Sequence, residues 1–313
     1  MPDKRSENGN DSPLVDGDWL EARLGEPSLR IFDATTVLAF PEDGQDGYYT
    51  LSSGRDAYIE EHISGAAFAD LLLELTDQQA KHAFTVLPSA TFAERIGALG
   101  VGNDSIVVVY DQFDPTRNPD AFYQHWAGRL WWQLRLEGFD NVAVLDGGLA
   151  QWRREGRPVE AGETHYPPAQ FTARRRPELI ADKAQVREAI TRDDILLLNT
   201  VDPVTHAGGR TTFSRPGHIP NSRNVWYEDI FDAATGKLKS PDELRAHFSR
   251  VGALDPSKRT ITYCGSGIAA SVEALALATL GRDDVAVYDG SLTEWTADPD
   301  LPLETGAWAR AIT

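Results

Sequence analysis

The one cysteine of the 313-residue chain lies in the stretch Thr262-Tyr263-Cys264-Gly265-Ser266-Gly267-Ile268-Ala269-Ala270. An apolar run rich in β-forming residues ends at Tyr263, and two glycines then open a tight loop. An alanine-rich helical pattern begins at about Ala269. The sequence therefore predicts a strand, a loop and a helix, with a thiol as the first residue of the loop.

A thiol in this position is predicted to be a nucleophile. A helix N-terminus carries roughly half a positive charge and several N–H groups without partners, which favour the thiolate form of a nearby cysteine. Gly265 and Gly267 allow those N–H groups to approach the sulfur closely. A lone cysteine is more often a small buried residue. However, an inert core cysteine does not need the following Gly-Ser-Gly, which lowers helix and strand propensity.

The composition limits the class of protein. The length suggests about two domains of ~150 residues, each large enough for its own core. No apolar run reaches the ~18 residues of a membrane span, and no signal peptide is evident, so we expect a cytoplasmic protein without a membrane partner. The net charge of −18 argues against binding to nucleic acid. The seven histidines and the cysteine show no metal-ligand spacing, so no metal or other cofactor is expected.

Two copies of one pattern follow each other along the chain. Residues 61–67 are matched by 217–223, and residues 144–148 with a following tryptophan are matched by 287–291 with another. The strand-like run that ends before Asp111 is matched by the run that ends before Cys264. The first copy therefore carries an aspartate where the second carries the thiol, and we expect the first copy to be catalytically silent.

Short apolar runs alternate with helical patterns in both copies, which is typical of parallel βαβ units in an α/β fold. The expected strands are residues 29–33, 105–110, 142–145, 195–198, 260–263 and 285–288. The expected helices are residues 55–62, 89–99, 121–137, 182–190, 241–249 and 269–280. We predict a disordered tail (1–12), a non-catalytic first domain (13–158), a linker (159–180) with a solvated run of three arginines, and a catalytic second domain (181–313).

The tandem repeat resembles the two-domain rhodanese family of sulfurtransferases. The motifs that carry the resemblance are His62-Ile63-x-Gly65-Ala66, the loop that begins at Cys264 and the two Asp-Gly turns, and it covers about residues 13–306. It implies two tandem rhodanese-like domains, each a parallel sheet flanked by helices. Thiosulfate-using members carry Arg-Lys after the cysteine, whereas Gly265-Ser266 is similar to members that use 3-mercaptopyruvate. An uncharged loop suits a singly charged α-keto acid better than a dianion.

The resemblance also implies the chemistry. The Cys264 thiolate takes the sulfur of 3-mercaptopyruvate, pyruvate leaves, and a thiol such as thioredoxin, or cyanide, accepts the sulfur from the persulfide. The loop that would cradle the persulfide is Gly265, Ser266, Gly267, Ile268 and Ala269. A relay of Ser266, His62 and Asp56 would supply the proton that pyruvate needs, in a cleft between the domains. His62 as a turn-packing residue and Asp56 as a helix-capping residue remain open.

Arginines for the substrate are the point where the chain departs from the family. Members usually carry Asp-x-Arg after the first strand of the second domain, and the matching residues here are Asn199-Thr200-Val201. Arg210 or Arg215 could bind the substrate carboxylate with two hydrogen bonds, or either could be a surface residue.

Other classes of function are weaker interpretations. A cysteine phosphatase shares the strand–loop–helix unit but needs an arginine at the end of the loop, where this chain has Ala269 and Ala270. A non-catalytic persulfide carrier or redox sensor needs only an accessible thiol. Thiosulfate is the closest alternative donor for an enzyme.

Overall fold

A computed structural model describes residues 12–39, 50–113 and 125–306 of the chain. The chain forms two compact units. Unit 1 comprises residues 1–79, 86–176 and 232–238, and unit 2 comprises residues 80–85, 177–231 and 239–313. The predicted tail (1–12) and the first residues of the predicted helix 121–137 lie almost wholly outside the described residues.

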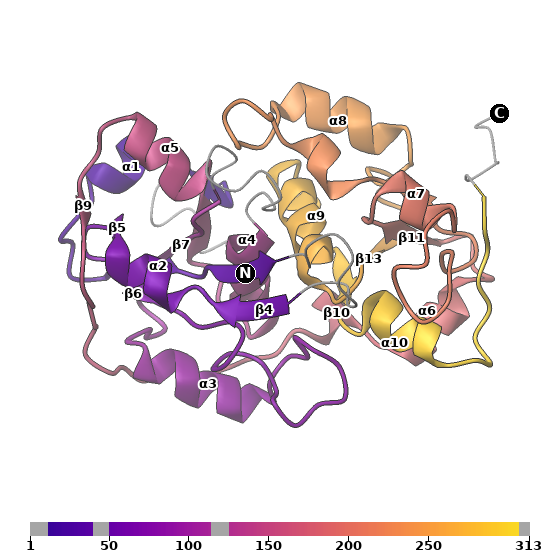
Figure 1. Cartoon of the computed structure of the whole chain (residues 1–313), viewed down its shortest axis with the longest axis horizontal. Helices are drawn as coiled ribbons and strands as arrows, with labels where there is room; N and C mark the ends of the chain where they lie inside the picture. Colours follow the sequence, from indigo (N-terminus) through magenta and orange to yellow (C-terminus); the bar gives the residue numbers. More distant parts are fainter. Residues whose placement is uncertain (1–11, 40–49, 114–124, 307–313) are drawn as a thin grey trace. The chain divides into compact units, whose positions relative to one another are not determined.

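Unit 1 is built on a five-stranded sheet in which every pairing is parallel (Figure 1). The central strand has the sequence Ile-Val-Val-Val-Tyr, and its β-branched residues fit a sheet that is covered on both faces. In spatial order the strands are β1 (Leu14–Val15), β8 (Val142–Leu145), β7 (Ile106–Tyr110), β2 (Leu29–Asp33) and β6 (Ala67–Phe68).

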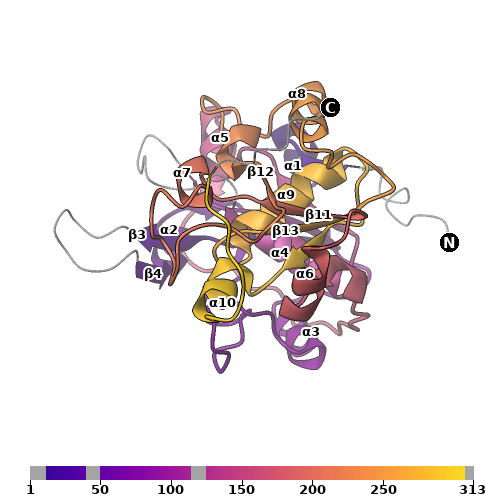
Figure 2. The same ribbon diagram turned by 90° about the vertical axis from the view of Figure 1, so that its right-hand side faces the viewer.

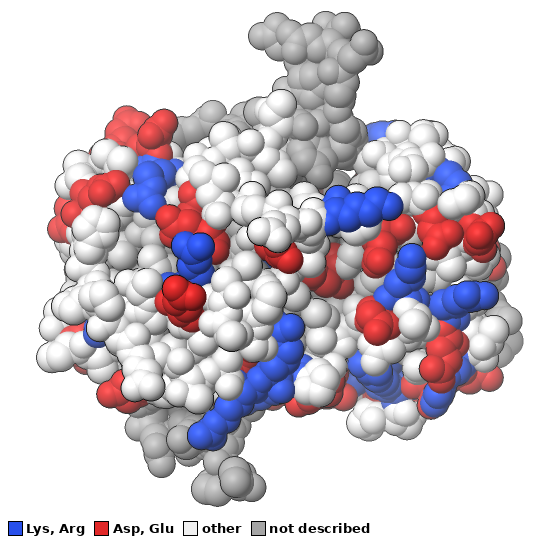
Figure 3. Space-filling view, turned by 90° about the horizontal axis from the view of Figure 1, so that it is seen from below, with Lys and Arg blue, Asp and Glu red and all other residues white. Residues whose placement is uncertain are grey.

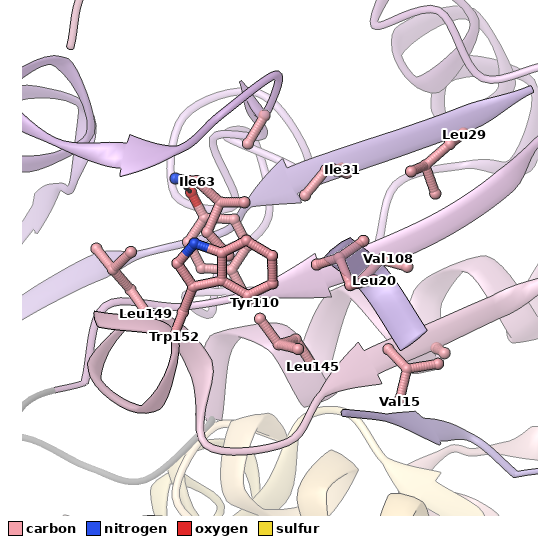
Figure 4. Close-up of a cluster of buried hydrophobic side chains, with 12 residues drawn as sticks. Val15, Leu20, Leu29, Ile31, Ile63, Val108, Tyr110, Leu145, Leu149 and Trp152 are labelled. Atoms are coloured by element: carbon pink, nitrogen blue, oxygen red, sulfur yellow. Dashed lines mark hydrogen bonds between the residues drawn. The ribbon is translucent and has the colours of Figure 1, made fainter. Parts of the chain in front are cut away.

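Helices cover both faces of the unit 1 sheet. Figure 4 shows one face, where Leu20 from α1 (Gly17–Glu21) and Trp152 from α5 (Gly148–Arg154) pack with side chains of the strands. Helix α4 (His125–Leu136) packs on β7 and β8. The two remaining helices are α2 (Arg55–Glu60) and α3 (Ser89–Ala98), and a hairpin joins β3 (Thr36–Ala39) to β4 (Thr50–Ser53).

The predicted linker is bonded to unit 1 as far as Arg176. A short strand β9 (Val159–Glu160) pairs with β5 (His62–Ile63). The Tyr166 hydroxyl donates to the carbonyl of Gly65 (2.6 Å). Arg175 and Arg176 bind the carboxylates of Glu137 and Asp140 through Nε–Oε1 (2.7 Å) and Nη1–Oδ1 (2.6 Å) bonds. Arg174 and Arg175 are exposed and Arg176 is half-buried, so the run is solvated as predicted, but two of the three arginines are also paired with acidic residues that follow α4.

Unit 2 repeats the plan of unit 1 with an all-parallel five-stranded sheet. Its strands, in spatial order, are β10 (Ile180–Ala181), β14 (Ala286–Tyr288), β13 (Arg259–Tyr263), β11 (Ile195–Asn199) and β12 (Arg223–Asn224). Figure 2 shows α9 (Ile268–Thr279) and α8 (Pro241–Ser249) on one side of β11 and β13, and α6 (Lys183–Ala189) and α10 (Ser291–Ala297) on the other. The shorter elements are η2 (Pro177–Leu179), α7 (Pro203–His206) and η3 (Tyr227–Ile230).

The structure confirms the predicted α/β fold and the central elements of both repeats. Each predicted strand and helix matches an observed element within about two residues, apart from the start of α4, which is outside the described residues. Equivalent strands occupy the same places in the two sheets, so the orders β1-β8-β7-β2-β6 and β10-β14-β13-β11-β12 are the same order twice. The pairing supports two copies of one fold.

Residues 232–238 belong to unit 1 although they lie in the sequence between two segments of unit 2, residues 177–231 and 239–313. The N–H of Leu238 donates to Asp146 Oδ1 (3.0 Å), and the guanidinium of Arg154 binds the carbonyls of Ala234 and Thr235. Residues 80–85 belong to unit 2 in the same way. The boundary between the units is thus not a single point in the chain.

The surface carries charges of both signs. On the face in Figure 3, lysine and arginine side chains lie among aspartate and glutamate side chains, so the net charge of −18 is not concentrated in one acidic patch there. Among the helices that the structure describes, none has the length and apolar character to cross a membrane.

Candidate active site

Cys264 lies between β13 and α9, as the sequence predicts. It follows the last residue of the strand, and Gly267 precedes the helix in a left-handed conformation (φ 78°) that favours glycine. Cys264 is 4% exposed, whereas Gly265 and Ser266 are half-buried. The thiol is therefore held below the surface, beside a loop without charged side chains.

The start of α10 fixes the backbone of the cysteine loop. Ser291 Oγ accepts a hydrogen bond from the N–H of Cys264 (3.1 Å) and donates one to the carbonyl of Tyr288 (2.7 Å). The N–H groups of Leu292 and Thr293 donate to the carbonyls of Cys264 and Gly265 (3.0 Å each). The first two residues of the cysteine loop are thereby bonded to one helix start.

Ser291 adopts a left-handed backbone conformation (φ 48°), which is strained for a residue with a Cβ atom. Its counterpart in unit 1 is Gly148, with φ 52°. The serine therefore accepts a conformation better suited to glycine and supplies the hydroxyl that binds Cys264. Sequence reasoning noted the Asp-Gly-Ser turn only as part of the repeat, although the Gly-to-Ser difference between the copies was a signal for this role.

Asp111 occupies in unit 1 the position that Cys264 occupies in unit 2. Its Oδ2 accepts hydrogen bonds from the N–H groups of Trp126 (3.2 Å) and Ala127 (3.1 Å), in the first turn of α4. Burial raises the pKa of this carboxyl to about 7, despite the bonds from Ala127 and Trp126. The helix start of the first repeat therefore holds a side-chain carboxylate of its own, which supports the prediction that this copy is silent.

His62 is a buried residue of unit 1. Its Nδ1 lies 2.8 Å from the carbonyl of Tyr58, its ring stacks on the Tyr58 ring, and its Nε2 lies 3.4 Å from Glu160. His218 of unit 2 repeats these contacts, with Nδ1 2.7 Å from the carbonyl of His206 and the two imidazole rings stacked. The shared contacts favour the turn-packing role for His62, and its role in a proton relay stays a prediction.

The other two residues of the predicted relay lie on accessible parts of their units. Asp56 is exposed in the first turn of α2, and the residue that caps this helix is Gly54 rather than an aspartate. Ser266 is half-buried in the loop after Cys264, and its hydroxyl binds no other residue that the structure describes. Both side chains are free to meet a ligand, and their catalytic roles stay predictions.

The two candidate arginines differ in their surroundings. Arg210 is exposed, and its Nη1 lies 3.7 Å from Asp202. Arg215 donates hydrogen bonds to four carbonyls: from Nε to Thr296 (3.0 Å), from Nη1 to Leu301 (2.9 Å), and from Nη2 to Asp298 (2.6 Å) and Trp295 (3.4 Å). Through these bonds Arg215 joins the end of α10 to the loop that follows it, which favours a structural role for this residue.

A buried polar cluster that the sequence did not predict lies at the end of β11. Asn199 Nδ2 lies 3.0 Å from Nδ1 of His206, whose ring centroid is 3.7 Å from that of His218. Burial lowers the pKa of His206 to about 3, with a smaller contribution from His218, so this imidazole is neutral at physiological pH. Within the described ranges, no three histidine, cysteine or acidic residues are grouped in a way that could hold a metal ion.

The fold and the site together define an α/β protein with two repeats, whose candidate reactive group is a thiol at a helix N-terminus in the second. The model of the rhodanese-like domain matches residues 16–155 and 182–298. The chain therefore belongs to the rhodanese family.

Several curated relatives match almost the whole chain. The 3-mercaptopyruvate sulfurtransferase of Escherichia coli K12 is 33% identical over 296 residues, which are 93% of this chain and 97% of the relative. The human 3-mercaptopyruvate sulfurtransferase is 34% identical (90% and 91% covered), and the thiosulfate sulfurtransferase of Bos taurus is 33% identical (95% and 97%). The crystal structure of SseA from E. coli, described as a 3-mercaptopyruvate sulfotransferase, has a TM-score of 0.74 at 31% identity and covers 90% of this chain and 98% of its own. The chain is a sulfurtransferase of this two-domain type.

Proposed function

We propose that the chain moves a sulfane sulfur from 3-mercaptopyruvate to a thiol or to cyanide, by way of a persulfide on Cys264. The observation that carries the proposal is a single thiol at the start of α9, in a loop whose side chains are uncharged. A helix start stabilises negative charge on the thiolate and then on the outer sulfur of the persulfide.

The reaction has two steps. The thiolate of Cys264 attacks the sulfur of 3-mercaptopyruvate, an S–S bond forms, the C–S bond breaks, and the electron pair leaves on the enolate of pyruvate, which takes up a proton. The acceptor thiolate or cyanide then attacks the outer sulfur and releases the Cys264 thiolate. Since the chain has no second cysteine, the sulfur must leave to an external acceptor, and thioredoxin stays a candidate for it.

Thiosulfate is the second candidate donor. The thiosulfate sulfurtransferase of B. taurus matches this chain as well as the E. coli 3-mercaptopyruvate enzyme does, at 33% identity. Val201 stands where the family usually has its substrate arginine, which weakens the case for an α-keto acid. The neutral loop at Gly265 and Ser266 weakens the case for thiosulfate, because a dianion lacks a cation there.

Mass spectrometry of the intact protein tests the proposal. After incubation with 3-mercaptopyruvate we expect the mass of one added sulfur atom, its loss on addition of cyanide, and many equivalents of pyruvate per chain. The Ser266→Ala variant should reduce turnover with 3-mercaptopyruvate more than turnover with thiosulfate, because only the first donor needs a proton on its leaving group. Loading without turnover would identify a carrier or sensor, and equal loss with both donors would remove Ser266 from the relay.

The two arginines give a second prediction. Arg215→Met should lower the free energy of unfolding by about 2–4 kcal/mol, since it removes charged donors from four carbonyls. Its KM for the donor should stay close to that of the wild type. Arg210→Met is the matched variant: stability should change by less than about 0.5 kcal/mol because the side chain is exposed. If Arg210 binds the substrate carboxylate, the KM of the Arg210→Met variant for the donor should rise about tenfold.

Urea unfolding and steady-state kinetics on the same preparations separate the two roles. A raised KM with unchanged stability in Arg215→Met would contradict the structural role of Arg215.

A further inference from the structure

The residue after the thiol, Gly265, is a glycine for a reason of space. Gly267 has a left-handed backbone, but the φ of Gly265 lies outside that region, so its conformation is open to other residues. A Cβ atom added to Gly265 would lie only 2.9 Å from Cζ and 3.0 Å from Cε1 of Phe213. Carbon atoms in favourable contact are about 3.5–4.0 Å apart. The ring of Phe213 therefore leaves no room for a side chain at position 265.

Phe213 is held in this place by its own surroundings. The residue is half-buried and packs against the core cluster of unit 2 that includes Tyr263. On one side of it in the sequence, Thr212 Oγ1 lies 3.2 Å from Thr205 Oγ1, and on the other side Arg215 binds its four carbonyls. Movement of the ring away from Gly265 would therefore lose packing in the core.

The backbone of Gly265 is held as well. Its carbonyl accepts hydrogen bonds from the N–H (3.0 Å) and from the Oγ1 (2.7 Å) of Thr293 in α10. The loop thus has little freedom to move away from the ring, and the contact between Gly265 and Phe213 is fixed from both sides.

The first repeat supplies an internal comparison. Gln112 follows Asp111 just as Gly265 follows Cys264. The Nε2 of Gln112 donates to Oδ2 of Asp33 (2.7 Å) and to the carbonyl of Glu61 (2.9 Å), so a long side chain leaves the loop at this position. The copy without the thiol therefore has a polar side chain on the loop itself, and the copy with the thiol has a bare backbone against an aromatic ring.

We propose that Phe213 is a specificity-determining residue for the sulfur donor. Its ring keeps position 265 free of a side chain, and so free of a cation next to the thiol. Since Phe213 and Gly265 are only half-buried, a donor that approaches the loop meets part of the ring.

An apolar ring beside the thiol disfavours a dianion, which would lose hydration there without a compensating partner, and it favours a donor with a carbon body and a single charge. The inference rests on the proposed function, because it concerns the choice between 3-mercaptopyruvate and thiosulfate as donors.

The first measurement tests the contact and needs no donor. It compares the thermal midpoints of the full chain, Gly265→Ala, Phe213→Ala and the double variant. Gly265→Ala should lower the midpoint by at least about 3 °C when Phe213 is present, and by about 1 °C or less in the Phe213→Ala background. Equal effects of Gly265→Ala in the two backgrounds would overturn the inference. Phe213→Leu, which keeps an apolar side chain but lacks the ring, gives the same comparison if Phe213→Ala does not fold.

The second measurement tests donor choice by steady-state kinetics with cyanide as acceptor. Phe213→Ala should raise kcat/KM for thiosulfate relative to 3-mercaptopyruvate at least about tenfold, and a further Gly265→Arg substitution should raise thiosulfate use again. Gly265→Arg alone should lower turnover with both donors, because the ring is still in place. Ile195→Ala is the matched control and should keep the wild-type ratio: Ile195 packs on the same core cluster, but at the start of β11, the end far from Cys264.

The outcomes separate this inference from the proposed function. A donor ratio that is the same in Phe213→Ala and in the wild type would overturn the role of Phe213. A wild type that prefers thiosulfate would refute the proposed donor, and a tenfold rise of kcat/KM for thiosulfate in Phe213→Ala would still support the role of the ring.

Discussion

Replacement of Cys264 by serine is expected to abolish sulfur transfer from every donor to every acceptor. A serine hydroxyl cannot form a persulfide, and the chain has no other cysteine to take the sulfur. The fold should persist, because the bonds that hold the loop are made by the backbone N–H and carbonyl of residue 264. The variant should therefore lose its sulfur-transfer activity and keep the free energy of unfolding of the wild type.

Three measurements on Cys264→Ser check this prediction: pyruvate release, thiocyanate formation and the intact mass after incubation with donor. Unchanged thermal unfolding is the control for the fold. Thiocyanate production at a substantial fraction of the wild-type rate would show that sulfur passes directly from donor to acceptor, and the persulfide mechanism would then be wrong.

Replacement of Asp111 by asparagine is expected to stabilise the protein at neutral and alkaline pH. Burial raises the pKa of this carboxyl from 3.8 to about 7, with Asp33 adding to the effect. The unfolded chain thus loses this proton near pH 4, and the folded chain loses it near pH 7. Between these values the folded state binds more protons, so the free energy of unfolding falls as pH rises and stays low above pH 7.

Asparagine can accept the same two hydrogen bonds from Trp126 and Ala127 without a buried charge. A shift of about three pKa units corresponds to about 4 kcal/mol of stability lost at high pH when the buried carboxyl ionises. The gain on replacement is smaller than this, because the side-chain N–H groups of the asparagine would be buried without partners. We expect Asp111→Asn to raise the free energy of unfolding by about 2–4 kcal/mol at pH 8 and to have little effect near pH 4.

Urea unfolding between pH 4 and pH 8.5 measures this dependence, and Asp140→Asn is the matched control. Burial alone would raise the pKa of Asp140, but Arg176 and Arg135 hold it below 3.8. Its replacement should therefore destabilise the protein at neutral pH, which is the opposite sign. A difference between wild type and Asp111→Asn that does not change with pH would contradict the argument.

The central elements of the fold could be predicted because each leaves a pattern in the sequence. The β-branched run of β7 and the alanine-rich run of α9 mark a buried strand and a helix by composition. Gly100 and Gly138 mark helix ends with left-handed backbones (φ 89° and 85°). The edge strands β1 and β10 have two residues each and pair through the backbone, so they leave no periodicity to detect.

Site residues could be predicted where the residue type and its place in a sequence motif both indicate the role. They could not be predicted where the role depends on contacts between residues far apart in the sequence. Cys264 was found because glycines follow it. The neighbour of Cys264 at the sheet edge is Thr200, which is 64 residues away in sequence, so this proximity appears only through strand register. The engagement of Arg215 with four carbonyls leaves no sequence signal. The packing role of His62 could have been inferred from its repeat, since His218 matches it.

The assignment of residues 232–238 to unit 1, and of residues 80–85 to unit 2, bears on how this gene can evolve. Duplicated modules often survive the loss of one copy, because each can fold and be inherited alone. Here, a cut between the two halves of the sequence would also take residues 80–85 from unit 2 or residues 232–238 from unit 1. Inheritance of one half alone would therefore give an incomplete unit.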